Sequence, residues 1–150
     1  MARPFRLQTL LDLGAHHLDA AALELQKLHG ALLQAQGKLD QLRAFQAEYE
    51  VTLATSMAQG LEADRLRDFQ RFLTKLTLAI RSQSTEVERC RQAWTQQHRR
   101  WLDLRQREQA LIALRERHAQ AEALRDRRRD QKEQDEFALR TRKENPLDQS

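Results

Sequence analysis

Residues 11–53 read LDLGAHHLDAAALELQKLHGALLQAQGKLDQLRAFQAEYEVTL, and apolar side chains recur in this stretch every seven residues. The first series contains Leu11, Leu18, Leu25, Leu32, Leu39 and Leu53, with Gln46 as its one polar member. The second series lies three residues later and contains Ala21, Leu28, Ala35, Leu42 and Tyr49, preceded by Gly14 as a weak member. Two apolar positions per heptad form a narrow stripe that must pack along another helix. The sequence therefore predicts a coiled coil.

The composition is typical of a rod that buries one seam. The chain has 4 Gly, 2 Pro, 5% aromatic and 32% charged residues, proportions that do not suit a thick globular core. Its 26 basic and 22 acidic residues are interleaved, as on solvated helical faces. The start of the chain lacks the uninterrupted apolar core of a signal peptide, no stretch approaches the roughly 20 apolar residues of a membrane span, and the single Cys90 cannot form an intramolecular disulfide. We expect a soluble, cytoplasmic protein.

We expect two helices joined by a turn. The first covers residues 5–54, because Pro4 is tolerated at a helix start but not inside a helix. Residues 55–62 interrupt the heptads and contain Gly60, which suits a turn. The second helix covers residues 63–142 and is followed by a disordered tail, 143–150, in which Asn145 and Pro146 prevent helix continuation. It has its own heptad series, which runs from Leu66 to Leu111 and includes Leu73, Leu76, Ile80, Gln83, Val87, Cys90, Trp94, Gln97 and Trp101. Residues 1–150 are thus predicted to form a single coiled-coil rod.

The predicted fold class is all-α, a long two-helix antiparallel coiled-coil hairpin with an overhanging C-terminal helix. Antiparallel pairing about the turn places Leu53 near Arg65 and Leu11 near Arg107. The first helix therefore covers the second helix only as far as about residue 113. Roughly 25 residues of the second helix then project alone, over about 40 Å. An unpaired helix of that length is rarely stable in water, so a partner protein is expected there. The same heptads also permit an intermolecular dimer.

The sequence lacks the constellations that carry catalysis. None of the five histidines has a partner at the i, i+4 spacing of a zinc site. There is no glycine-rich phosphate loop and no nucleophile beside a recognisable base. Two helices packed side by side also leave no concave cavity for a substrate. We therefore expect no enzymatic activity, no metal, no cofactor and no small-molecule substrate.

One segment near the turn is apolar beyond the needs of a single seam. It contains a stripe of residues at i, i+4, i+7 and i+11, rotated from the heptad seam and only partly shared with it: Phe72, Leu76, Ala79 and Gln83. The stripe is either an exposed binding surface or a widening of the core. We favour the binding surface.

The C-terminal part of the chain is basic. Residues 99–143 contain 14 basic and 9 acidic residues, and Arg127, Arg128 and Arg129 are consecutive. Consecutive residues on a helix point in different directions, so these arginines form a collar rather than a stripe that tracks a phosphate backbone. Positive charges on all sides of a helix match an acidic cavity of a partner protein that surrounds the helix. Nucleic-acid binding is the less favoured alternative.

Several segments together resemble one protein family. They are Phe5 with Leu7 and Thr9–Leu11, the stretch Phe45–Tyr49, the turn ending in Gly60, the stretch Asp68–Leu73, and the stretch Asp130–Phe137. In their order and spacing they resemble the FliJ family of bacterial flagellar export proteins, and the likeness covers essentially the whole chain.

The resemblance implies a non-enzymatic component of the flagellar type III export apparatus, similar to the central stalk of rotary ATPases. The open end would insert into the hexameric flagellar export ATPase, with ring contacts from Phe5, Arg127, Asp130, Gln131, Lys132, Asp135, Glu136 and Phe137. The stripe of Phe72, Leu76, Ala79 and Gln83 would contact the cytoplasmic domain of the membrane export gate.

The resemblance further implies that the protein handles export chaperones and is peripherally associated with the inner-membrane export apparatus at the flagellar base. Neither nucleic acid nor a small molecule is expected as a partner. Two alternatives stay open. One is the equivalent stalk of a virulence-type secretion system. The other is a basic coiled coil that binds nucleic acid, whose affinity would fall steeply with salt.

Overall fold

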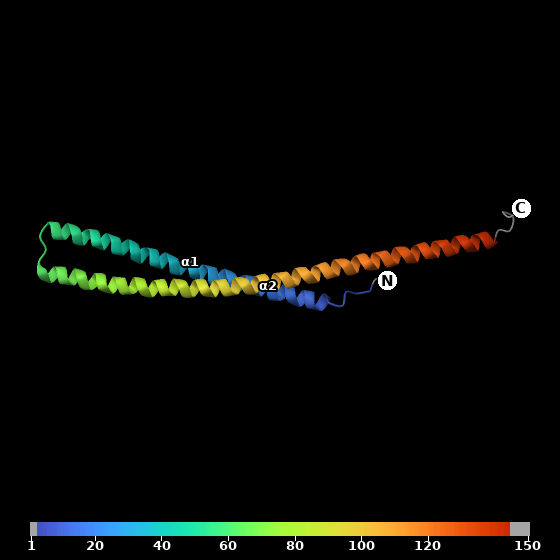
Figure 1. Ribbon diagram of the computed structural model, residues 1–150, viewed down its shortest axis with the longest axis horizontal. Coiled ribbons are helices and arrows are strands. Elements are labelled where there is room, and N and C mark those ends of the chain that lie inside the picture. Colours follow the sequence, from blue (N-terminus) through green and yellow to red (C-terminus); the bar gives the residue numbers. More distant parts are fainter. Residues whose placement is uncertain (1–2, 145–150) are drawn as a thin grey trace. The chain divides into compact units, whose positions relative to one another are not determined.

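The computed structural model describes residues 3–144, and almost all of them belong to two helices (Figure 1). Helix α1 covers Gln8–Ala58 and helix α2 covers Ala63–Glu144. The predicted all-α hairpin is confirmed, and no strand occurs between residues 3 and 144. Contacts divide the chain into two units, residues 19–103 and a second unit formed by Met1–Leu18 with Leu104–Ser150. The expectation of one rod over 1–150 stays a prediction.

The helix ends differ by a few residues from the expected bounds. Helix α1 continues to Ala58 rather than residue 54, and at its end the amide of Gln59 donates to the carbonyl of Thr55 at 3.2 Å. The turn is therefore short, and Gly60 adopts a φ of 93° there, a conformation that favours glycine. Helix α2 includes Lys143 and Glu144. The rest of the predicted tail, 145–150 with its helix-stopping Asn145 and Pro146, lies outside the described residues.

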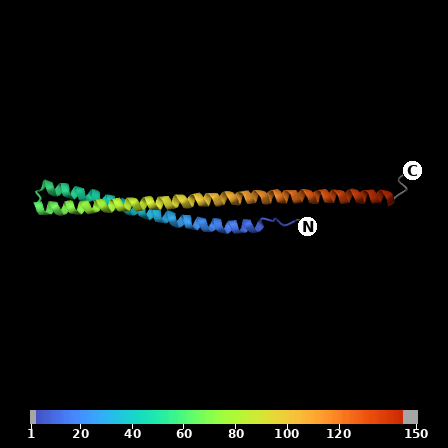
Figure 2. The ribbon, with the colours of Figure 1, turned by 60° about the horizontal axis from the view of Figure 1, so that its bottom comes forward.

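In the unit of residues 19–103, α1 and α2 lie side by side and antiparallel in both views (Figures 1 and 2). A cluster of buried side chains from both helices holds them together, with Leu32 and Ile80 packed against its edge. The cluster consists of Ala35, Leu39, Val87 and Cys90. Each of these residues occupies a heptad position of the sequence pattern, and Cys90 acts there as a small apolar residue. The heptad seam is thus the core of this unit.

Two glutamines in the seam connect α2 to the backbone of α1. The amide nitrogen of Gln83 donates to the carbonyl oxygen of Ala35 at 2.9 Å, and that of Gln97 donates to the carbonyl oxygen of Ala21 at 3.2 Å. Both alanines are buried and small, so the backbone behind them is within reach of a side chain from α2. Each glutamine therefore satisfies its amide and marks one register between the helices.

Around Gln97 the seam admits large rings. Trp94 stacks on His98 with ring centres 4.9 Å apart and an interplanar angle of 10°, and His98 is followed by Trp101 at 6.1 Å. His29 of α1 approaches Trp94 at 6.4 Å. All except His29 are half-buried, so the rings widen the seam and leave their edges in water.

Over residues 3–144, neither helix contains a segment long and apolar enough to cross a membrane.

We expect the glutamine pair to be measurable in stability. Gln83→Ala and Gln97→Ala should each lower the free energy of unfolding by about 1 kcal/mol, the usual net contribution of such a hydrogen bond. The double variant should lose about 2 kcal/mol, because the sites are about 21 Å apart on α2 and act independently. Urea unfolding followed by circular dichroism measures both. The exposed Gln92→Ala is the control, and equal losses in all three single variants would contradict a role in register.

Candidate partner-binding surfaces

The segment before α1 packs on α2 within the unit of residues 3–18 and 104–144. His118 donates through Nε2 to the carbonyl oxygen of Arg3 at 2.8 Å, and the Phe5 ring lies 5.7 Å from the imidazole of His118. The amide of Gln8 donates to the carbonyl of Phe5, which joins this segment to the first turn of α1. Helix α1 therefore begins at Gln8 rather than at residue 5, because Phe5 is used in a contact with α2 instead of in a helical turn.

Beside this contact, Glu122 is the one buried charged residue of the described chain, with 6% of its surface exposed. Its carboxylate accepts a hydrogen bond from Nη1 of Arg125 at 3.2 Å. An open cavity of about 490 Å³ lies between the N-terminal segment and α2, and Phe5, Leu7 and Ala121 line it together with Glu122. The seam of α2 thus continues through His118 and Glu122, although neither residue has the apolar character that marks a heptad.

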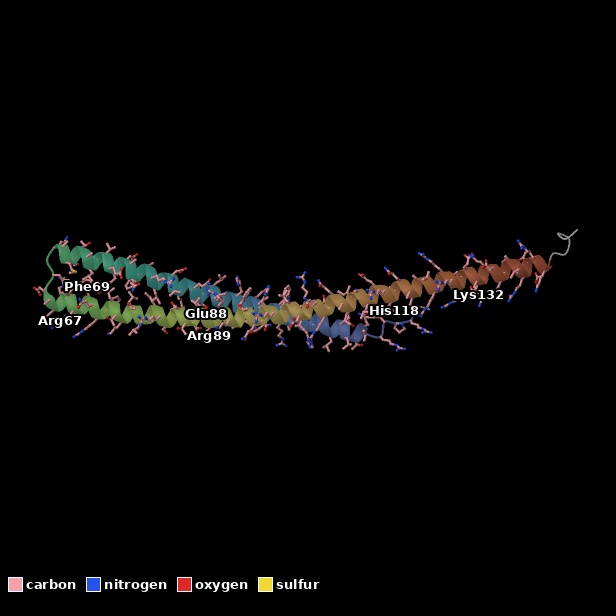
Figure 3. The ribbon with its side chains drawn as sticks, in the orientation of Figure 1. Arg67, Phe69, Glu88, Arg89, His118 and Lys132 are labelled. Carbon is pink, nitrogen blue, oxygen red and sulfur yellow. The ribbon has the colours of Figure 1, made fainter. Side chains whose placement is uncertain are left out.

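Because of these contacts, the unpaired part of α2 begins later than the sequence predicts. The sequence predicts that α2 stands alone from about residue 113, because α1 is exhausted there. In the structure, the N-terminal segment covers α2 as far as Arg125, so that expectation is wrong by about three helical turns. The free part of α2 covers residues 126–144. In Figure 3, His118 marks the covered part of α2 and Lys132 the free part.

The predicted ATPase-ring residues other than Phe5 all lie on this free part and are exposed: Arg127, Asp130, Gln131, Lys132, Asp135, Glu136 and Phe137. They surround the helix, because successive residues are rotated by about 100°. Phe137 is 72% exposed, and Leu139 is 58% exposed. Gln131 donates to Asp135 at 3.4 Å along the helix, and Asp135, Leu139 and Arg142 line a shallow groove. Two exposed apolar side chains among charges suit a socket that encloses the helix.

Phe5 is placed differently from the other seven. It is half-buried and its ring packs on His118, so it belongs to the covered part of α2. The structure therefore separates the eight predicted ring contacts into one packed residue and seven exposed ones.

The predicted export-gate stripe is only partly exposed. Leu76 is buried, with 7% of its surface exposed, and the Gln83 amide is occupied by the Ala35 carbonyl. Ala79 is exposed and Phe72 is 36% exposed. The prediction that the whole stripe faces outward is therefore wrong, because Leu76 and Gln83 also belong to the heptad seam. What reaches the surface is its edge, Phe72 and Ala79.

That edge is extended by aromatic residues of α1 that sequence reasoning did not include. The Phe72 ring lies 4.4 Å from that of Tyr49 and 5.9 Å from that of Phe45, and Tyr49 also meets Phe69 at 5.0 Å. Phe45 is 48% exposed. Antiparallel pairing brings Tyr49 opposite the segment of Phe69 and Phe72. The contact between these rings could therefore have been predicted from the pairing of the heptads. The surface is an aromatic cluster that crosses from α1 to α2.

No group of three or more His, Cys, Asp or Glu side chains gathers as metal ligands would within residues 3–144. The features with the character of binding surfaces are the aromatic cluster in residues 19–103 and the free helix in residues 126–144. The class that the fold defines is therefore an antiparallel helical hairpin protein.

The chain belongs to the flagellar FliJ protein family, whose family model, described as flagellar FliJ protein, matches residues 3–146. It is similar to the flagellar FliJ protein of Salmonella typhi, with 33% identity over 150 residues that cover 97% of this chain and 99% of the relative. The flagellar FliJ protein of Escherichia coli K12 shows the same identity and coverage. No solved structure matches the chain. The family resemblance seen in the sequence is thereby confirmed.

We expect Phe5→Ala to loosen the start of the chain. The variant loses the ring contact with His118, worth about 1.4 kcal/mol or a tenfold change in local opening. Hydrogen exchange of the amides of residues 8–11 should therefore become about tenfold faster, while exchange at residues 76–90 stays unchanged. Arg6→Ala, at an exposed neighbouring position, serves as the control. Unchanged exchange in Phe5→Ala would show that the segment is held by other contacts.

Proposed function

We propose that this flagellar protein is a non-enzymatic stalk of the type III export apparatus. The free part of α2, residues 126–144, enters the central opening of the hexameric export ATPase and promotes assembly and activity of the ring. The aromatic cluster contacts the cytoplasmic domain of the membrane export gate, and the same protein handles export chaperones. These contacts hold it at the cytoplasmic side of the inner membrane, at the flagellar base.

The observation that carries the ATPase proposal is the exposed C-terminal end of α2. Residues 127–144 are helical and all exposed, and they present Phe137 and Leu139 to solvent. A solvated helix of this length gains little stability from its own hydrogen bonds. A surrounding ring provides the burial that the helix lacks, and carboxylates in that ring would neutralise the arginines of residues 127–129.

The gate contact is supported by the exposed aromatic edge of the hairpin. Phe45 and Phe72 are both partly exposed, and Ala79 on the same side of α2 leaves room for a partner to approach. Aromatic side chains at the centre of a patch are the residues that most often dominate binding. Leu76 and Gln83 support this surface from below rather than touching the partner.

Two alternatives are less well supported. An equivalent stalk of a virulence-type secretion system would share this architecture, but the family match and both relatives are flagellar proteins. Nucleic-acid binding is disfavoured because Arg127, Arg128 and Arg129 point to different sides of α2 and acidic Asp126 and Asp130 flank them. Asp126 already pairs with Arg129 at 3.7 Å.

Truncation after Asp126 tests the ATPase contact. We expect the shortened protein to keep its hairpin and to lose stimulation of ATP hydrolysis by the export ATPase of the same organism, because only the free helix is removed. Hydrolysis rates at equal molar amounts of both proteins measure the effect. Truncation after Glu144 is the matched control and should stimulate fully. Full stimulation by the shorter protein would place the contact elsewhere.

Ala79→Lys tests the gate contact without disturbing the seam. Ala79 is exposed, so the change should alter the free energy of unfolding by less than about 0.5 kcal/mol. Binding to the cytoplasmic domain of the export gate, measured by calorimetry, should weaken about tenfold, because a charge enters an apolar contact. Leu78→Lys changes an exposed neighbour about a quarter turn away and should bind normally. Equal loss in both variants would argue against the aromatic edge.

Phe72→Ala is the less informative variant for the same question. The Phe72 ring packs on Tyr49 and Phe45, so its removal also weakens the hairpin itself. Phe72 therefore contributes to the packing of the hairpin as well as to its exposed edge.

A further inference from the structure

The outer side of α2 near the turn carries a row of cations that the proposed function does not use. Arg67, Arg71 and Lys75 follow one another at four-residue spacing, which aligns them along one face of a helix. All three are exposed. Figure 3 shows Arg67 on the side of α2 away from α1, whereas Phe69 is directed toward α1. We call Arg67, Arg71 and Lys75 the basic row. Its Lys75 end borders the edge formed by Phe72 and Ala79, because Lys75 lies three residues after Phe72 and four before Ala79.

The basic row has no anionic partner within residues 3–144. Farther along α2, arginines are paired: Arg89 donates through Nε to Glu86 at 2.9 Å, and Arg91 pairs with Glu88 at 3.3 Å. The hydrogen bond from Arg89 is the main cause that holds the pKa of Glu86 below its ordinary value. No such pair is formed by Arg67, Arg71 or Lys75 in the described chain. Their donors are therefore available to an external carboxylate.

The basic row borders a groove and ends at an apolar side chain. A shallow groove of about 430 Å³ lies along the row, lined also by Gln70 and Thr74. The Thr74 hydroxyl is occupied, because it donates to the Gln70 carbonyl of its own helix at 2.9 Å. Three residues beyond Lys75 on the same face, Leu78 is 58% exposed. From Arg67 to Leu78 the surface extends over about 16 Å, roughly three helical turns.

We propose that the basic row is a docking surface for an acidic helical segment of a partner protein. Aspartate or glutamate side chains at four-residue spacing match the cations one by one, and guanidinium groups bind carboxylates in a bidentate manner. An apolar residue near the end of that segment covers Leu78. An anionic membrane fits less well, because Asp64 and Asp68 are exposed beside the row and repel a uniformly negative plane.

A designed helical peptide tests the proposal with the full-length chain. The probe carries glutamates at four-residue spacing followed by one leucine, and the comparison peptide has the same composition in scrambled order. Fluorescence anisotropy should show that the full-length chain binds the ordered probe at least about tenfold more tightly than the scrambled one. Binding should also weaken as salt rises, because exposed charges are screened.

Matched variants separate the basic row from net charge. Arg67→Gln, Arg71→Gln and Lys75→Gln together should weaken probe binding about tenfold. The control, Lys27→Gln, Arg99→Gln and Arg100→Gln, removes the same residue types from exposed positions and should change binding less than about threefold. Equal losses in both triple variants would overturn the proposal. If the row variant loses helix content, the wild-type chain with a probe carrying lysines in place of glutamates answers the question, and binding of that probe would also overturn it.

Two other occupants are distinguished by further measurements. Vesicles of phosphatidylcholine with about 30% phosphatidylglycerol test an anionic membrane. If the row variant loses vesicle binding but keeps probe binding, the surface is a lipid site and the proposal is wrong. Analytical ultracentrifugation tests a second copy of the chain. Self-association that disappears only in the row variant would identify that copy as the occupant and equally overturn a partner helix.

Discussion

The hydrogen bonds from Gln83 and Gln97 to the backbone of α1 fix the alignment on which the surfaces of residues 19–103 depend. A leucine seam alone tolerates a shift by one heptad, since each shifted leucine finds another apolar neighbour. The glutamines remove that freedom, because their amides reach a carbonyl only where Ala21 and Ala35 leave space. A shifted helix would bury unsatisfied amides at a cost of about 1–3 kcal/mol each.

This register determines which side chains meet near the turn. It brings Tyr49 and Phe45 of α1 to Phe69 and Phe72 of α2, so that an aromatic cluster forms from two helices. The basic row is independent of register, because all its members belong to α2. The hairpin therefore presents two surfaces of different origin, an aromatic one assembled by pairing and a cationic one present in a single helix.

The third surface is the free part of α2, and it exists because α2 extends beyond the segments that pack against it. The N-terminal segment extends the cover of α2 to Arg125 through the contacts of Phe5 and Arg3 with His118. Beyond that point α2 continues to Glu144 with most side chains exposed. Helix propensity rather than packing maintains this end, since residues 126–144 contain neither glycine nor proline. Such an end suits a partner that supplies the missing contacts.

The sequence by itself determined the fold class, the turn at Gly60 and the seam. Heptad periodicity is a local property of one helix, and all the buried apolar residues, from Leu11 to Cys90, occupy the positions it predicts. Family membership could also be read from the order of short segments. The exposed character of residues 127–137 followed from their charge and from the lack of residues left in α1 to pair with them.

Only the tertiary structure decided how the N-terminal segment, Leu76 and Gln83 are used. Arg3 and Phe5 meet His118 through one hydrogen bond and one ring contact, neither of which repeats along the chain, so no periodic pattern reveals them. Leu76 and Gln83 belong to two stripes in the sequence, and the rotation of α2 about its axis selects the seam for both. That rotation is set by contacts with another helix. A pattern within one segment specifies which residues share a face, whereas the neighbouring helix determines which face is buried.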